Sequence, residues 1–306
     1  MRMLRYAIGA VALAVATVVG TFAASAQTKP LIAFAVSGTT NPFYASMAQG
    51  VRDEAAKQGL DVLVLDAQDK AEKQASDIED ARTRGVKALL VNAVNASIGP
   101  LVNNVLQAGI PVITVQRNLP ADVKVTAHVG ANNVLIGEAL IGWWAQQAGG
   151  KETKILVMTG TPGAASSEDR ITGIKNTLPK HANIKVLAMQ TGHYDRARAL
   201  PVAENMLQAH PDAEAILCLN DNMAMGVLAA AKGKPIKIVG IDANPDAVQA
   251  VAQGQLTATI ALRPARFGAL GVELAAKKLR GEQVPQSVLT EQIEFITKDN
   301  AANYKP

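Results

Sequence analysis

Cysteine, aromatic side chains and long apolar runs are all scarce in this chain of 306 residues. Cys218 is the only cysteine, so no disulfide can form within the chain even in an oxidising compartment. Because Cys218 lies in the apolar run 216–219, we expect a small buried residue on a strand and not a reactive thiol. Aromatic residues make up only 4% of the chain, which makes the adjacent pair Phe43 and Tyr44 unusual.

An excess of charge of one sign is also lacking. The chain has 30 Lys and Arg residues against 26 Asp and Glu. Two of the basic residues, Arg2 and Arg5, belong to an N-terminal leader, so 28 remain against 26 beyond it. The sequence has no block of like charge and no basic stripe with interleaved aromatic residues, features that are typical of nucleic-acid binding. We therefore expect no nucleic-acid partner.

The one long apolar run lies at the N-terminus, at about residues 6–22. Arg2 and Arg5 precede it and an A-S-A tripeptide at 24–26 follows it, which is the pattern of a secretory signal peptide cleaved before Gln27. A membrane anchor is the alternative, but the run is short and rich in small residues. Charges, Pro or Gly interrupt every later apolar stretch before the ~20 residues of a membrane-spanning helix. Residues 1–26 are thus predicted to be a signal peptide and the mature chain to be exported.

Beyond the leader, short apolar runs alternate with longer amphipathic stretches. Predicted strands lie at 31–37, 61–67, 86–94 and 111–117, with helical stretches from Pro42, near 70–84 and near 96–108. After a run at 125–130 the pattern restarts, with strands at 153–160, 184–190, 213–220, 235–242 and 256–262. Runs that are apolar throughout are typical of parallel strands covered by helices on both faces of a sheet. The sequence predicts two α/β domains of similar plan.

Polar residues gather directly after the predicted strands. In parallel sheets of this kind, ligands bind at the carboxyl ends of the strands, where loops lead into helices. These positions lie at 37–44, 66–69, 92–95, 116–118, 160–170, 193–196, 220–222, 242–246 and 262–266. They carry amides, carboxylates, guanidinium groups and rings, a set that suits a neutral polyhydroxylated ligand such as a sugar.

Phe43 and Tyr44 fall at the start of the first predicted helix, where Pro42 fits the first helical position. Both rings are therefore expected at the edge where ligands bind, with Ser37 and Asn41 beside them. Packing of one of the two rings beneath the helix is the alternative.

Catalytic and metal-binding signatures are absent from the sequence. It contains no G-x-x-x-x-G-K-[ST], G-x-S-x-G or H-E-x-x-H, and no G-x-G-x-x-G after the first strand. The four histidines are not spaced as metal ligands. We predict a chain without catalytic residues, cofactor or metal. An exported hydrolase with Asp242 and Asp221 as acid–base partners is an alternative, as is phosphate binding at the turn 160–163.

Five segments in the same order carry a family resemblance. SGTTNPFY (37–44), VITVQRN (112–118), YDRARAL (194–200), LNDNMAMG (219–226) and VGIDANPDA (239–247) together resemble the type I periplasmic sugar-binding proteins, most closely their ribose-binding members. The resemblance runs from about residue 31 to near 297. It implies a periplasmic, monomeric two-domain clamp that passes a monosaccharide or polyol to the permease of an ABC importer, with a chemoreceptor as a second candidate partner.

The resemblance also implies the domain boundaries. The N-terminal sugar-binding domain would comprise residues 27–131 and 263–290, and the C-terminal one residues 132–262 and 291–306. A three-strand hinge would cross between them near 130–132, 262–263 and 290–291.

Ligand contacts carry over residue by residue. The first domain would supply Ser37, Asn41, Phe43, Tyr44, Gln116 and Arg117, and the second Arg170, Tyr194, Asn220, Asp242 and Leu262. Rings would flank the sugar, the two arginines would donate to its oxygens, Asp242 would accept from a pair of hydroxyls, and the two asparagines would do both.

Two of these positions depart from the ribose-binding pattern, which has Asp where this chain has Gln116 and Gln where it has Leu262. A hydroxyl facing Leu262 in a closed cleft would lack a partner, at a cost of ~1–3 kcal/mol. A deoxy sugar, a ketose, another anomer or a short polyol is therefore a candidate ligand beside ribose. Water filling the space beside Leu262 is the alternative. A furanose-like signalling molecule feeding a sensor is the alternative function.

Overall fold

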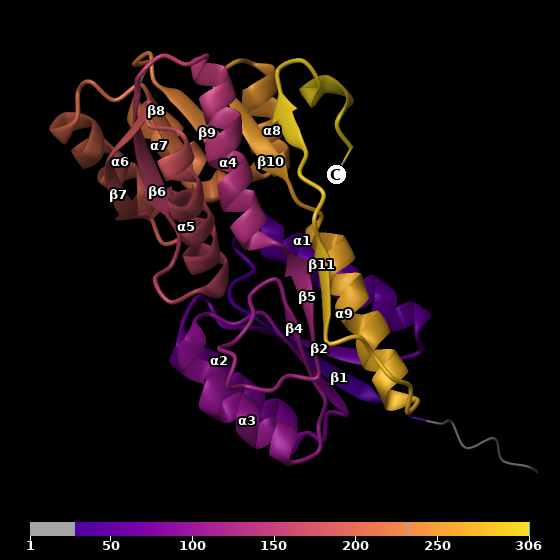
Figure 1. Cartoon of the computed structure of the whole chain (residues 1–306). Coiled ribbons are helices and arrows are strands. Elements are labelled where there is room, and N and C mark those ends of the chain that lie inside the picture. The colour runs from indigo at the N-terminus through magenta and orange to yellow at the C-terminus, as the bar shows by residue number, and fades with distance from the viewer. Residues whose placement is uncertain (1–27, 232, 306) are drawn as a thin grey trace, which may run out of the picture.

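The computed structural model describes residues 28–231 and 233–305, so the predicted signal peptide lies outside the described residues. Two six-stranded sheets form two lobes, and helices flank both sheets (Figure 1). The predicted fold class, an α/β chain with two similar units, is confirmed. Each predicted strand is present and most are a few residues shorter than their apolar runs.

The first lobe, as named here, contains the sheet with strand order β2-β1-β3-β4-β5-β11, in which every neighbouring pair is parallel. Its strands are β1 (Leu31–Val36), β2 (Asp61–Asp66), β3 (Ala88–Val91), β4 (Val112–Val115), β5 (Ala127–Ala131) and β11 (Ser287–Thr290). Its helices are α1 (Pro42–Lys57), α2 (Ala71–Thr83), α3 (Gly99–Gln107), α9 (Pro264–Leu279) and the short η1 (Ala96–Ile98).

The second lobe contains the sheet with strand order β7-β6-β8-β9-β10-β12. Its strands are β6 (Thr153–Thr159), β7 (Ile184–Thr191), β8 (Ala215–Cys218), β9 (Lys237–Asp242), β10 (Ala258–Ala261) and β12 (Phe295–Thr297). Its helices are α4 (Asn133–Ala148), α5 (Ala165–Thr177), α6 (Arg196–Ala209), α7 (Asp221–Ala231), α8 (Pro245–Ala252) and the short η2 (Leu178–Lys180) and η3 (Ala301–Asn303).

The edge strands β11 and β12 were not predicted from apolar runs, because both are short and partly exposed. β12 also corrects the expectation of two wholly parallel sheets, since it pairs antiparallel with β10. The chain leaves the carboxyl end of β11 and enters the second lobe at the same junction. β12 therefore has to run away from the junction, against its neighbour.

Three connections join the lobes: from β5 into α4, from β10 into α9 and from β11 into β12 (Figure 1). All three start at the carboxyl ends of strands, so the carboxyl ends of both sheets lie at the junction between the lobes. This is the edge at which parallel sheets bind ligands. The residue boundaries of the two domains stay a prediction.

Close packing of α4 against α5 fixes the second lobe's contribution to this edge. A Cβ atom added to Gly137 of α4 would collide with the carbonyl oxygen of Arg170 on α5, and one added to Gly173 would collide with that of Val134. The two backbones can approach this closely only because both positions lack a side chain. Arg170 is thereby held against α4 at the junction.

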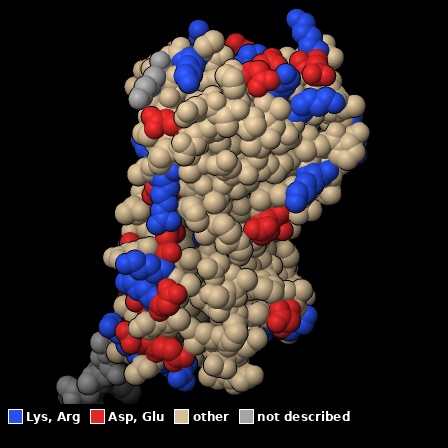
Figure 2. All heavy atoms as spheres, turned by 90° about the vertical axis from the view of Figure 1, so that its left-hand side faces the viewer, with Lys and Arg blue, Asp and Glu red and all other residues tan. Residues whose placement is uncertain are grey.

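Surface and helix properties bear on possible partners. On the face shown in Figure 2, acidic and basic residues are mixed and a broad central area carries neither. Within the described ranges, no helix is long and apolar enough to cross a membrane.

Candidate functional site

A cavity lies between the two lobes at the carboxyl ends of their strands. Its lining combines both lobes: Asn41, Phe43, Tyr44, Gln116, Ser166, Arg170, Tyr194, Asn220 and Asp242. The cavity volume is only about 10 Å³, so the lobes are closed on each other here. A backbone hydrogen bond across the junction, from Ala96 N to Gly163 O at 3.3 Å, belongs to the same closed arrangement.

The first turn of α1 supplies the aromatic wall. Asn41 caps the helix, accepting from the backbone N–H of Phe43 at 3.0 Å, and Pro42 follows at the first helical position. The rings of Phe43 and Tyr44 meet edge to face at 5.3 Å between centroids. Both side chains are buried, and burial raises the pKa of Tyr44 to about 12 although the charge of Arg117 opposes the shift. Its hydroxyl therefore stays protonated at neutral pH.

Gln116 and Arg117 follow β4, and Gln116 adopts a left-handed backbone with φ of 64°. The Gln116 Oε1 atom accepts from the backbone N–H of Ala131 at 3.0 Å. The Arg117 guanidinium donates from Nη1 to the carbonyls of Ala93 and Val94, both at 3.1 Å.

The Arg117 guanidinium also lies between two rings from different lobes. Its central carbon is 5.1 Å from the ring centroid of Tyr44 and 5.3 Å from that of Tyr194. A guanidinium placed this way over an aromatic face is attracted by the ring electrons. In this closed arrangement Arg117 thus links the first lobe to the second.

Side chains of the second lobe are held mainly by backbone groups of neighbouring strand ends. Arg170 donates from Nε to Asn133 Oδ1 at 3.0 Å and from Nη1 to the carbonyl of Leu219. Asn220 accepts from the backbone N–H of Met223 at 2.9 Å and donates to the carbonyl of Tyr194 at 3.4 Å. These contacts fix the orientation of both side chains before any ligand is present.

Asp242 supplies the acidic group of the cavity and ends β9 with φ of 127°. Burial raises the pKa of Asp242 to about 7, although the charges of Arg170 and Arg117 oppose the shift. Behind it, the fully buried Asp221 accepts from Thr259 Oγ1 at 2.7 Å and from the backbone N–H of Asn244 at 2.8 Å. Asp221 therefore holds the turn that follows Asp242, and burial raises its pKa well above the ordinary value.

Among the predicted contact residues, Ser37, Arg117 and Leu262 are not part of the cavity lining. Ser37 donates to Asn92 Oδ1 at 2.6 Å, and Asn92 donates in turn to the carbonyl of Val115 at 2.9 Å. This places Ser37 in the framework that ties the ends of β1, β3 and β4 together.

Leu262 borders a neighbouring chamber on the hinge side. The volume of this chamber is about 330 Å³, and Asp242 lines both the chamber and the cavity. The chamber's apolar walls include Pro42, Pro245 and Pro264. Leu262 therefore lies beside the predicted site and not in its wall.

Sequence reasoning did not single out Ser166, whose Oγ lies 3.2 Å from the hydroxyl of Tyr194. It precedes Arg170 by four residues on α5, so the two share a helix face. That spacing is the signal that could have found it, once Arg170 was chosen.

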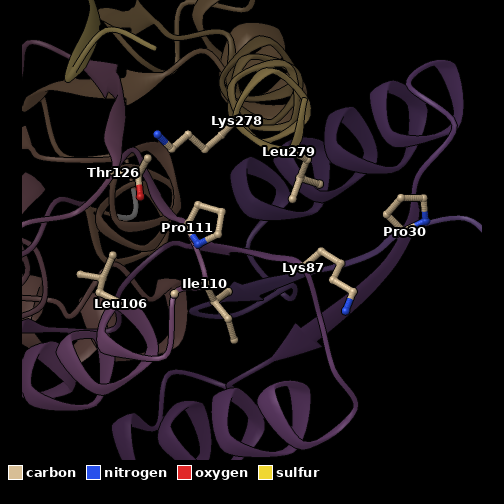
Figure 3. A pocket seen from close by; sticks show the side chains of 9 residues that line it. Pro30, Lys87, Leu106, Ile110, Pro111, Thr126, Lys278 and Leu279 are labelled. Atoms are coloured by element: carbon tan, nitrogen blue, oxygen red, sulfur yellow. The ribbon is translucent and has the colours of Figure 1, made fainter. Parts of the chain in front are cut away.

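A larger cavity lies at the opposite end of the first lobe's strands (Figure 3). Its volume is about 560 Å³. Its lining consists of Pro30, Lys87, Leu106, Gly109, Ile110, Pro111, Thr126, Lys278 and Leu279. No acidic or amide side chain is in that lining, and it lies at the amino ends of the strands. The junction remains the better candidate, because several polar groups converge there. In the part of the chain that the structure describes, no cluster of His, Cys, Asp and Glu could hold a metal ion.

Comparison with known proteins gives a consistent result. Residues 32–283 match the family model described as "Periplasmic binding protein domain". The chain is 38% identical over 288 residues to the ribose import binding protein of Escherichia coli K12, covering 93% of this chain and 95% of that one. It is 31% identical to the D-allose-binding periplasmic protein of the same organism, covering 77% and 80%.

A solved structure shows the same architecture. The Caulobacter myo-inositol binding protein, bound to myo-inositol, superposes with a TM-score of 0.82 at 30% identity. The match covers 90% of this chain and 95% of that chain.

Proposed function

The chain belongs to the periplasmic binding protein family, and from this premise we propose that it captures a monosaccharide or polyol between its lobes and delivers it to the permease of an ABC importer. The observation that carries the proposal is the cavity at the junction, whose lining comes from both lobes. A ligand there contacts both lobes only in the closed state, so it shifts the open–closed equilibrium toward closure. The permease would then recognise the closed surface.

The proposed contacts divide the ligand's groups among the lobes. Phe43, Tyr44 and Tyr194 would cover its C–H surfaces, and the two buried arginines would donate to its oxygens. Asp242 would accept hydroxyl protons. Roughly six to eight hydrogen bonds at ~1 kcal/mol net each, together with the ring contacts, offset association and closure costs of several kcal/mol. The expected affinity is micromolar or tighter.

Binding without turnover is part of the proposal. Asp221 and Asp242, the pair that could have served as acid and base, do not both face the cavity: Asp242 lines it, whereas Asp221 is occupied by Thr259 and the Asn244 backbone. We also propose cleavage before Gln27, residence in the periplasm and a monomeric state. Ribose, allose and myo-inositol are the ligands in the names of the relatives above, which favours a sugar or polyol over a furanose-like signalling molecule.

Thermal unfolding of the mature chain with a panel of pentoses, hexoses, deoxy sugars, sugar acids and polyols tests the proposal. A ligand that binds only the folded state raises the midpoint in a concentration-dependent way. We expect at least one member of the panel to do so and to be recovered chemically intact. A flat response across the panel would overturn the proposed function, and conversion of the bound sugar would overturn its non-enzymatic part.

A further inference from the structure

Two consecutive residues of the first lobe hold three buried nitrogen atoms that have no hydrogen-bond partner among residues 28–231 and 233–305. They are Gln116 Nε2, Arg117 Nε and Arg117 Nη2. The side chains of Gln116 and Arg117 are 3% and 1% exposed. A buried donor without a partner costs about 1–3 kcal/mol, and a charged one costs more. Three such donors on two consecutive residues indicate a place built to receive acceptor atoms.

The anchoring of Arg117 decides which of its edges is free. Nη1 is occupied by the carbonyls of Ala93 and Val94. The edge formed by Nε and Nη2 carries two parallel N–H groups and is left over. This is the edge that matches the two oxygens of a carboxylate in a bidentate pair.

Gln116, the preceding residue, is fixed as a donor. Its Oε1 atom is occupied by the backbone N–H of Ala131, at the end of β5 where the chain crosses to the second lobe. Because a backbone N–H can only donate, this contact sets which end of the amide is the oxygen. Gln116 is part of the cavity lining, and its remaining Nε2 atom can only donate.

Acceptors in the cavity are few by comparison. The side-chain oxygens of Asn41 and Asn220 already accept from backbone N–H groups, at 3.0 and 2.9 Å. Asp242 is the only carboxylate in the lining. A neutral sugar brings one donor proton with every hydroxyl, whereas a carboxylate brings acceptors alone.

Charge points the same way. The guanidinium of Arg170 and the carboxylate of Asp242 line the cavity, and the buried guanidinium of Arg117 lies beside it, against the lining residues Tyr44 and Tyr194. Within the described part of the chain, neither guanidinium forms an ion pair with an acidic side chain. Asp69 interacts with Arg117 electrostatically, and neither of the two lines the cavity. An anionic group on the ligand would give the buried guanidinium of Arg117 a partner of opposite charge.

We propose that the ligand is a sugar acid, an aldonate or uronate, whose carboxylate accepts from the Nε–Nη2 edge of Arg117 and from Gln116 Nε2 while its hydroxyls donate to Asp242. The proposal rests on the proposed function and narrows it to one chemical class. Gln116 is then a specificity-determining residue, because its Oε1 atom is occupied and its free Nε2 can only donate to a ligand.

Calorimetric titration of the mature chain with matched pairs of ligands tests the proposal. Suitable pairs are D-ribose with D-ribonate, D-galactose with D-galacturonate and D-glucose with D-gluconate. We expect at least one acid to bind ~100-fold or more tightly than its parent sugar, because the sugar leaves the buried donors unpaired or must supply hydroxyl protons that find no acceptor.

The variant Gln116→Glu provides the sharper comparison. Glutamate keeps an oxygen for the N–H of Ala131 and replaces the free N–H donor with a carboxylate oxygen of the same size. We expect it to weaken binding of the acid by ~100-fold or more and to leave or strengthen binding of the parent sugar. Gln107→Glu, the same change at an exposed position on α3, is the matched control and should alter neither.

Failure of this inference is distinguishable from failure of the proposed function. A neutral sugar that binds more tightly than its acid, and tolerates Gln116→Glu, would overturn the inference and leave sugar capture standing. Absence of binding by every sugar and every acid would overturn both. The acid-versus-sugar comparison on the unaltered chain needs no variant, so the proposal can be refuted even if Gln116→Glu does not fold.

Discussion

The two lobes share a plan but contribute different chemistry to the junction. The first lobe supplies the adjacent rings of α1 together with the donor groups of Gln116 and Arg117, whereas the second supplies the acidic Asp242 and a second guanidinium. The first lobe therefore supplies donors that have no partner within the described part of the protein, and the second lobe supplies the carboxylate acceptor of Asp242. Neither lobe alone can satisfy a polyhydroxylated ligand, and only closure assembles the complementary set. Selectivity for the closed state follows from this division.

The largest effect is expected from removing the second lobe's acceptor. Asp242→Ala should abolish detectable binding of the natural ligand, because it leaves ligand hydroxyls without their carboxylate acceptor. The thermal midpoint of the unliganded protein should not fall. Calorimetry and thermal unfolding measure the two quantities. Asp246→Ala, at an exposed carboxylate paired with Arg196, is the matched control and should bind normally. Near-native affinity of Asp242→Ala would refute the placement of the site.

The next effect concerns the corresponding donor of the first lobe. Arg117→Lys should weaken binding by ~10–100-fold, since an ammonium group cannot hold the carbonyls of Ala93 and Val94 and also present a two-donor edge. Arg170→Lys should weaken binding less, because in the described structure Arg170 has no buried nitrogen left unpaired. Calorimetric titration of both variants with the same ligand gives the ratio. Equal losses would remove the asymmetry argued above.

The lobes should also respond to pH in opposite ways. Burial lowers the pKa of His128, in the first lobe, to about 4, so the stability that rests on its neutral form is lost as the pH falls from about 6.5 to about 4. Burial raises the pKa of Asp242, in the second lobe, to about 7. Its ionisation therefore destabilises the unliganded fold increasingly as the pH rises from about 4 to about 7.

Two variants separate these contributions. Asp242→Asn should raise the free energy of unfolding of the unliganded protein by more than ~1 kcal/mol at pH 7 and have little effect at pH 4. His128→Gln should remove part of the stability loss below pH 6, after allowance for the lost contact with Thr114. Urea unfolding across this pH range measures both. If the free energy of unfolding changed with pH in the same direction in both variants, the opposite contributions assigned to His128 and Asp242 would be contradicted.

Sequence reasoning reached the fold because the strands it rests on are buried on both faces and therefore apolar throughout, as in β1 and β3. The short edge strands β11 and β12 carry no such signal. At the site, the position of a residue after a strand places it at the junction but does not fix the direction of its side chain. Ser37 and Leu262 show this, since both stand at strand ends and neither lines the cavity.

The unpaired donors of Gln116 and Arg117 could not be predicted in this way either. They depend on contacts with Ala131, Ala93 and Val94, which lie apart from them in sequence and meet them only in the folded lobe. The same holds for Asp221, which was considered as an acid–base partner and instead holds the turn after Asp242. Residue type was readable from the sequence, whereas the remaining hydrogen-bonding capacity of each group was not.

The smallest effect is expected at Leu262, where the chain passes from the second lobe back to the first. A glutamine here would restore the residue type of the ribose-binding pattern and should move ligand preference toward ribose. Because Leu262 borders the adjoining chamber and touches the cavity only through their shared residue Asp242, the change for Leu262→Gln should stay below ~10-fold, less than one well-placed hydrogen bond. Calorimetric comparison of ribose with the best ligand, before and after the substitution, measures it. A larger gain for ribose would mean that residue 262 contacts the bound ligand, and that specificity is set at the crossing as well as within the lobes.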